Sequence, residues 1–232
     1  MAGADVPPAD RRLYRRLSRC HAAALGSRLL LRTAVQLFLI RHPRPLLAAG
    51  ICYGQLDVEA ADPQPLAERL RGLLPAGTPV VASPSRRTRG LAEALQRRPR
   101  FDRRLLEIDF GAWEGRPWDQ LDRRLLDAWA ADVLHFVPPG GESAAMLQAR
   151  AVDCVRSLRG PRCALVTHAG VIRAVLGHWL GLPVGEWSRL TLDFGSITRL
   201  EIERAQDELP SGRREERQRH SPAAGVLHYL NR

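Results

Sequence analysis

The sequence predicts an α/β protein, a three-layer α/β/α sandwich in which helices cover both faces of a largely parallel sheet. Short apolar runs alternate along the chain with stretches of helical spacing, which is the pattern of a parallel sheet. Two of these runs, 35–40 and 163–167, are each followed within two residues by a histidine, His42 and His168. Ligands of such sheets bind beyond the C-terminal ends of the strands. We therefore expect both histidines at one site.

The other elements can be assigned in order along the chain. A helix is expected over 64–74, where leucines recur at helical spacing until Pro75 and Gly77 end it. The elements expected after it are a strand over 78–82, a helix from Ser83-Pro84 to about 96, an extended segment over 102–115, helices over 117–130 and 143–158, a strand over 163–167, a helix over 170–180, a hairpin-like pair near 189–194 and 197–203, a polar linker over 204–221 and a last strand over 226–230.

Composition excludes two classes of partner from our expectations. The net charge is +10, yet residues 1–34 alone carry seven arginines against two aspartates, and the rest of the excess is spread thinly. Aromatic residues do not interleave with the basic ones, so we expect no nucleic-acid binding. No apolar stretch approaches the roughly 18 residues of a membrane span, so we expect no membrane partner. The 45% of hydrophobic residues suffices for a full core.

The termini and cysteines suggest one domain in a reducing compartment. Residues 1–33 form an Arg-rich extension, expected to be poorly ordered, before a single domain over 34–232. The extension lacks a secretory signal; a dispensable segment or a start placed too far upstream fits better than an organellar transit peptide. The four cysteines show no CxxC or metal-ligand spacing. They are expected to be reduced, mostly packing residues of a cytoplasmic protein, with Cys52 beside the site.

The segment from Arg41 to Pro45 suits a nucleophile that faces an anion. Imidazole is partly uncharged near neutral pH, and arginine presents paired donors that fit phosphate oxygens. A second strand end carries His168, and a third carries Ser83 to Arg87. The residues at these three strand ends predict a phosphate site with a histidine on either side.

The residue types also predict the chemistry. His42 must be neutral at the attacking nitrogen, so its other nitrogen is expected to donate to a backbone carbonyl or similar acceptor. Arg41, Arg87 and a charged His168 would surround the phosphoryl oxygens, and no metal or cofactor is then needed. Three carboxylates compete for the role of proton donor. They are Glu107, which is favoured, Asp109 and Glu114. Trp113 is expected to be a packing residue.

Four blocks in the right order resemble the histidine phosphatase superfamily, whose fold is phosphoglycerate mutase-like. The blocks are Leu39 to His42, Ser83 to Arg87, Leu106 to Gly115 and Val166 to Arg173. The resemblance implies that His42 is the nucleophile and that Arg41 and Arg87 bind phosphate. It also implies that Glu107 is the proton donor and His168 the second histidine. Ser85, Thr88 and Leu91 depart from the usual second block.

Two segments, Arg41 to Pro45 and Gly50 to Asp57, resemble the α-ribazole phosphatase branch, which acts in cobalamin nucleotide-loop assembly. The substrate would then be a small phosphomonoester that contacts Tyr53, Gly54, Gln55 and Ala169 as well as the phosphate ligands. Tyr53 would offer a ring to a flat substrate group, or Tyr53 and Gly54 would only shape the loop. The alternatives are a broad sugar or nucleotide phosphatase and a catalytically silent phosphate-binding protein. A mutase is least expected, because residues 108–142 offer little covering structure.

Overall fold

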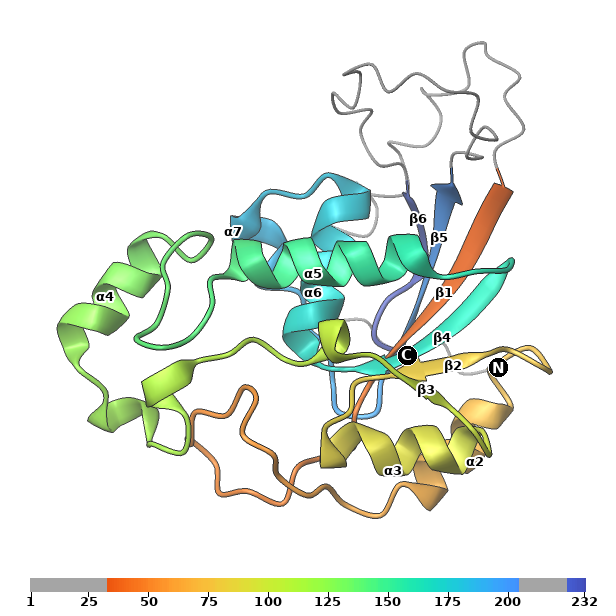
Figure 1. The fold of residues 1–232 in the computed structure, drawn as a ribbon, viewed down its shortest axis with the longest axis horizontal. Helices are drawn as coiled ribbons and strands as arrows, with labels where there is room; N and C mark the ends of the chain where they lie inside the picture. Colours follow the sequence, from red (N-terminus) through yellow and green to blue (C-terminus); the bar gives the residue numbers. More distant parts are fainter. Residues whose placement is uncertain (1–32, 205–224) are drawn as a thin grey trace, which may run out of the picture.

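Six strands form one sheet in the order β3-β2-β4-β1-β5-β6 (Figure 1). The computed structural model describes residues 33–204 and 225–232. Strands β3, β2, β4 and β1 are mutually parallel, β5 runs antiparallel to β1, and β6 antiparallel to β5. Their bounds are β1 Thr33–Arg41, β2 Val80–Ala82, β3 Arg100–Phe101, β4 Arg162–Thr167, β5 Ile197–Arg204 and β6 Gly225–Tyr229. The predicted, largely parallel sheet is confirmed.

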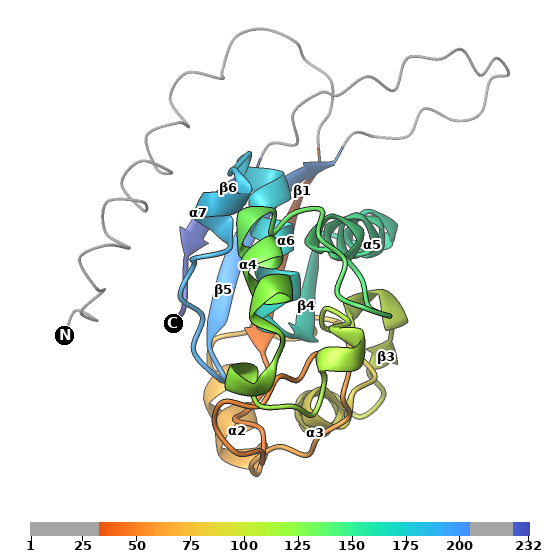
Figure 2. The ribbon, with the colours of Figure 1, turned by 90° about the vertical axis from the view of Figure 1, so that its left-hand side faces the viewer.

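Helices cover both faces of this sheet, which confirms the predicted sandwich (Figures 1 and 2). Helices α2 (Gln64–Arg71) and α3 (Arg86–Leu95) lie on one face, and α5 (Ala144–Ser157) and α6 (Ala169–Leu180) on the other. Alternate residues of β1 explain how both faces are apolar, because side chains along a strand point to opposite sides. Val35, Leu37 and Leu39 belong to the core under α5 and α6, whereas Phe38 and Ile40 belong to the core under α2 and α3.

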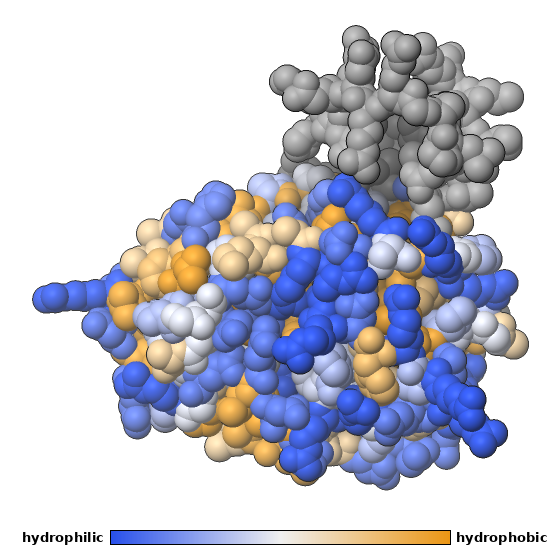
Figure 3. Space-filling model, in the orientation of Figure 1, coloured by the Kyte–Doolittle hydropathy of each residue, from blue (hydrophilic) through white to orange (hydrophobic). Residues whose placement is uncertain are grey.

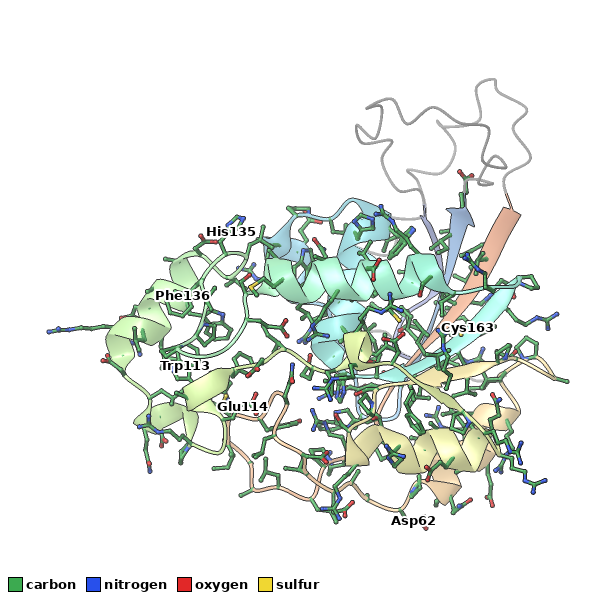
Figure 4. All side chains as sticks on the ribbon, viewed as in Figure 1. Asp62, Trp113, Glu114, His135, Phe136 and Cys163 are labelled. Atoms are coloured by element: carbon green, nitrogen blue, oxygen red, sulfur yellow. The ribbon has the colours of Figure 1, made fainter. Side chains whose placement is uncertain are left out.

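A separate aromatic cluster forms the core of a lobe beyond the sheet, where Figure 4 labels Trp113 and Phe136. The lobe contains two single 3-10 turns, Gly111–Trp113 and Trp118–Gln120, and helix α4 (Arg123–Ala131). Trp113 is buried there and makes the packing contacts predicted for it, such as a ring stack on Phe136 with centroids 5.9 Å apart. The helix expected over 117–130 is wrong in its first part, because only 123–131 form an α-helix.

The expected position of Cys52 beside the site is corrected. Cys52 is fully buried in the aromatic cluster with Trp113 and Leu121, and this packing, rather than the site, occupies its side chain. Burial and the charge of Glu114 raise the pKa of its thiol to about 12. Three cysteines, Cys52, Cys154 and Cys163, are buried free thiols, and Cys20 lies outside the described residues.

The hairpin predicted near 189–194 and 197–203 is also wrong. Residues 189–194 form no strand, and β5 pairs instead with β1 and β6. The leucines at 190 and 192 are buried, but the carbonyl oxygens of both residues accept hydrogen bonds from arginine side chains and not from a strand. The prediction failed because alternating apolar residues occur both in a buried loop and in a short strand, and the sequence pattern does not separate the two. Residues 1–32 of the predicted extension and residues 205–221 of the predicted linker lie outside the described residues, as do residues 222–224.

The surface mixes polar and apolar side chains, and apolar ones gather partly over the α4 lobe (Figure 3). Within residues 33–204 and 225–232, no helix has the length and apolar character needed to cross a bilayer.

Gly177 sets how closely α6 approaches α7 (Val184–Trp187), because a Cβ there would lie 2.5 Å from the Trp187 ring. We expect Gly177→Ala to be less stable than the matched variant Gly185→Ala by about 1–3 kcal/mol, the usual cost of overpacking. Gly185 is a sound control, since a Cβ there meets nothing within 4 Å. Urea unfolding measures both variants. Equal free energies of unfolding would show that the contact between the two helices is loose.

Candidate active site

His42 follows β1 directly and has its ring buried, with 2% of the residue exposed. Its Nδ1 lies 2.6 Å from the carbonyl oxygen of Pro43. A carbonyl only accepts, so Nδ1 carries the proton and Nε2 keeps a free electron pair. Burial, with the positive charge of Arg87, lowers the pKa of His42 to about 3. The imidazole is therefore neutral at ordinary pH, with its unprotonated Nε2 available to attack an electrophile.

His168 caps the N-terminus of α6 and is fully buried, with its ring centroid 5.2 Å from that of His42. Arg87 donates through Nε to His168 Nδ1 over 3.2 Å, and His168 Nε2 lies 2.8 Å from the hydroxyl of Ser83. Arginine cannot accept, so Nδ1 is unprotonated and Nε2 holds the ring proton. Burial and the charge of Arg87 keep the pKa of His168 well below its usual value. The prediction of a charged His168 is therefore wrong for this arrangement.

The positive charge of the site comes from Arg41 and Arg87. Arg87, at 1% exposure, donates to the carbonyl oxygens of Leu56 (2.9 Å) and Gly54. Arg41 donates to the Leu192 carbonyl, and its Nε is buried without a partner among the described residues. Burial lowers the pKa of both groups, but arginine remains protonated. Two desolvated cations with spare donors suit a phosphate dianion.

Tyr53 and Gly54 bring the loop over 50–57 to these arginines. The Tyr53 ring centroid lies 5.4 Å from Cζ of Arg87, and the phenol also interacts with Arg41. A Cβ at Gly54 would lie 1.9 Å from the carbonyl oxygen of Ile108, so only glycine fits this close approach. Tyr53 therefore lies at the site, and Gly54 shapes the loop.

Glu114 and Asp57 hold this loop in place. The Glu114 carboxylate accepts backbone N–H groups of Gln55 (2.7 Å), Leu56 and Phe110 (3.0 Å), and Figure 4 labels it beside the loop. Asp57 accepts the N–H of Arg86 over 2.8 Å, which ties the loop to the start of α3, the helix that carries Arg87. Glu114 is therefore a structural crosslink between the loop and the segment over 107–115.

Glu107 is the carboxylate that faces the site. One of its oxygens accepts the Gly170 N–H (3.1 Å) at the start of α6, next to the buried Ala169, and the other accepts the Ile108 N–H (3.0 Å). Its negative charge acts on both Arg41 and Arg87. Asp109 instead accepts the N–H of Gly111 over 2.8 Å. The geometry favours Glu107 over both competitors.

Arg150 on α5 holds the backbone that carries Glu107, and it was not predicted from the sequence. Its guanidinium donates to the carbonyl oxygens of Arg104 (2.8 Å), Leu106 (2.6 Å) and Glu107 (2.8 Å). It also pairs with Glu142, which accepts the N–H of Asp109 over 3.0 Å. The sequence did offer one signal, which is a charged residue on an apolar helix face. Position 150 belongs to the face of the helix that residues 147, 151 and 154 form.

Phe194 was missed as well. The centroid of its ring lies 5.5 Å from the ring centroid of His42 and 3.7 Å from Cζ of Arg41. Phe194 and Tyr53 thus place two aromatic rings next to His42 and the two buried arginines. A single phenylalanine in a loop carries no sequence signal for such a position.

A model of the histidine phosphatase superfamily (branch 1) matches residues 37–211, which is well over half of the chain. The chain belongs to the histidine phosphatase superfamily. The matched region includes His42, Arg87, Glu107 and His168, which the fold brings together at one end of the sheet.

Several members of the superfamily resemble this chain. A probable phosphoglycerate mutase of Salmonella paratyphi C is 30% identical over 151 residues, which cover 60% of this chain and 69% of that protein. A crystal structure of phosphoglycerate mutase from Thermus thermophilus is 35% identical with a TM-score of 0.60, covering 71% of this chain and 92% of that one. A mycobacterial glucosyl-3-phosphoglycerate phosphatase is 29% identical with a TM-score of 0.64, covering 73% and 91%. The likeness confirms a phosphoglycerate mutase-like fold.

The role of Glu107 predicts a dependence on the leaving group. Glu107→Gln should slow release of an alkyl alcohol by on the order of 10²–10⁴-fold, because a poor leaving group needs a proton in the transition state. Release of an acidic phenol, followed before the steady state, should suffer much less. Asp109→Asn and Glu114→Gln are the matched controls. If either control shows this dependence and Glu107→Gln does not, the proton donor is a different carboxylate.

Proposed function

We propose that this enzyme hydrolyses phosphomonoesters through a phosphohistidine at Nε2 of His42. The observation that carries the proposal is the hydrogen bond from His42 Nδ1 to Pro43, which leaves Nε2 unprotonated among the arginines. Nε2 attacks phosphorus in line with the ester oxygen, and the P–O bond breaks as the N–P bond forms. Glu107 supplies the proton that the departing alkoxide takes. In the second step it accepts a proton from the water that attacks the phosphohistidine, which releases phosphate.

The segment that covers the site, residues 108–142, favours hydrolysis over transfer of the phosphoryl group within the substrate. A mutase must shield its phosphoenzyme from water, and the covering residues 108–142 are mostly 3-10 turns and loops with the one helix α4. Among the relatives, one is named a phosphatase and others are named mutases. The first step, formation of phosphohistidine, serves both reactions, and access of water in the second step decides between them.

As substrate we propose α-ribazole 5′-phosphate, in the assembly of the nucleotide loop of cobalamin. The segments Arg41 to Pro45 and Gly50 to Asp57 support this choice. So do the rings of Tyr53 and Phe194, because paired aromatic rings next to a phosphate site suit a flat heterocycle. Free buried cysteines support a cytoplasmic location for the enzyme. A second candidate is a phosphoglycerate-type ester, favoured by a further arginine beside Glu107.

His42→Ala should abolish both turnover and trapping of the phosphoenzyme, because both ring nitrogens of His168, the other histidine at the site, are engaged by Arg87 and Ser83. Rapid acid-free quenching after mixing with ³²P-labelled substrate measures the trapped species. His135→Ala is the control, since His135 is an exposed residue of the α4 lobe (Figure 4). Alkali-stable, acid-labile label that persists in His42→Ala would refute the assignment of the nucleophile.

The substrate proposal predicts a preference for a ribose phosphate that carries a base. Stacking of a base on an aromatic side chain is worth about 1–3 kcal/mol, so kcat/KM for α-ribazole 5′-phosphate should exceed that for ribose 5-phosphate by about 5- to 150-fold. Tyr53→Leu should reduce this ratio, which compares two esters in the same variant and so cancels any effect on Arg41 and Arg87 that both esters share. Equal kcat/KM values for the two esters in the unaltered enzyme would contradict the proposed substrate.

A further inference from the structure

Arg173 lies on α6 one helical turn beyond Gly170, whose N–H holds the carboxylate of Glu107. Residues three apart on a helix share a face, so Arg173 is directed to the side of Glu107. Its Nε donates to the Leu190 carbonyl over 3.0 Å, and the Leu192 carbonyl, two residues further on, accepts from Arg41. One loop segment therefore holds both guanidinium groups at the same side of the site.

The surroundings of Arg173 are unfavourable for a cation without a bound anion or acceptor. The residue is partly buried, and burial lowers its pKa; the charge of Glu107 opposes this shift, and the charge of Arg41 adds to it. Within residues 33–204 and 225–232 it forms no ion pair, and Nε is the one nitrogen of its guanidinium with a hydrogen-bond partner. Its two terminal amino groups keep their donors available.

Because Arg173 lies on the side of Glu107, its position indicates which half of a substrate it would contact. Glu107 protonates the leaving oxygen, so groups next to its carboxylate face the alcohol half of the ester. Arg41 and Arg87 lie around His42 and bind the phosphoryl half. Arg173 is not needed to neutralise the phosphoryl group, and its free donors are available to the alcohol.

We propose that Arg173 forms a second subsite, which binds a pair of oxygen acceptors carried by the alcohol half of the substrate close to the ester oxygen. Two sources share this chemistry. They are the hydroxyl and ring oxygens of a ribose 5-phosphate and the carboxylate of a phosphoglycerate. A planar guanidinium with two unpaired amino groups fits either pair with two parallel hydrogen bonds. The subsite deepens the proposed function and rests on its assignment of Glu107 as the residue that protonates the alcohol.

The experiment compares three substrates in Arg173→Met: ethyl phosphate, which offers no such acceptors, ribose 5-phosphate and 3-phosphoglycerate. For each of the last two, the measured quantity is the ratio of its kcat/KM to that of ethyl phosphate. Loss of hydrogen bonds from a charged donor should reduce at least one ratio by on the order of 10- to 100-fold. A reduction confined to 3-phosphoglycerate identifies a carboxylate as the ligand, and one confined to ribose 5-phosphate identifies sugar oxygens. Arg156→Met is the matched control, because Arg156 is an exposed arginine at the end of α5.

Unchanged ratios overturn the proposal, whether all three activities fall together or none changes. An equal fall would mean that Arg173 acts on Glu107 or on phosphoryl transfer. If Arg173→Met does not fold, Arg173→Lys gives the same comparison, since lysine keeps the charge but not the paired donors. Trapping of phosphohistidine in the unaltered enzyme separates the two proposals. Its absence would refute the covalent mechanism, whereas the substrate ratios report on Arg173 alone.

Discussion

Backbone carbonyl oxygens, rather than carboxylates, hold the cations of this active site. Arg41 donates to Leu192, Arg87 to Gly54 and Leu56, and Arg173 to Leu190. A carbonyl fixes a guanidinium without cancelling its charge, so the full attraction for a phosphate dianion is retained. The cost is mutual repulsion among desolvated cations, which adds to burial in keeping both histidines neutral. Their pKa values are lowered by burial and by Arg87, so the arginines alone carry the positive charge.

The fold supplies the rigidity that this charge cluster needs. The parallel strands β1, β2 and β4 end at one edge of the sheet, and the residues after them reach the site from three directions. The backbone that leads to Glu107 is fixed in turn by Arg150, which donates to the carbonyl oxygens of Arg104, Leu106 and Glu107, and by the close approach of a glycine. At Gly170 a Cβ would lie 2.3 Å from the Glu107 carboxylate. Backbone N–H groups thus hold the carboxylate to which we assign the proton transfers.

The sequence predicts the parts of this site that lie next to strand ends, because a strand's apolar run and the residue after it are neighbours in the chain. His42, Arg87 and His168 are of this kind. What the sequence does not predict depends on contacts between distant segments. The proton of His168 is assigned by Arg87, 81 positions away, and Arg150 reaches carbonyl oxygens more than 40 positions away. The apolar residues near 190 and Cys52 were misplaced for the same reason, because burial in a loop or in a second core has the same sequence pattern as a strand or a site wall.

The central claim is that the Pro43 carbonyl fixes the tautomer of His42 and thereby directs the phosphoryl group to Nε2. The most direct measurement is the identity of the phosphorylated nitrogen in the trapped enzyme, determined by ³¹P–¹⁵N coupling after incorporation of ¹⁵N-labelled histidine. We predict phosphorus coupled to Nε2 of His42 with Nδ1 still protonated. Phosphorus on Nδ1 of His42, or on either nitrogen of His168, would contradict it.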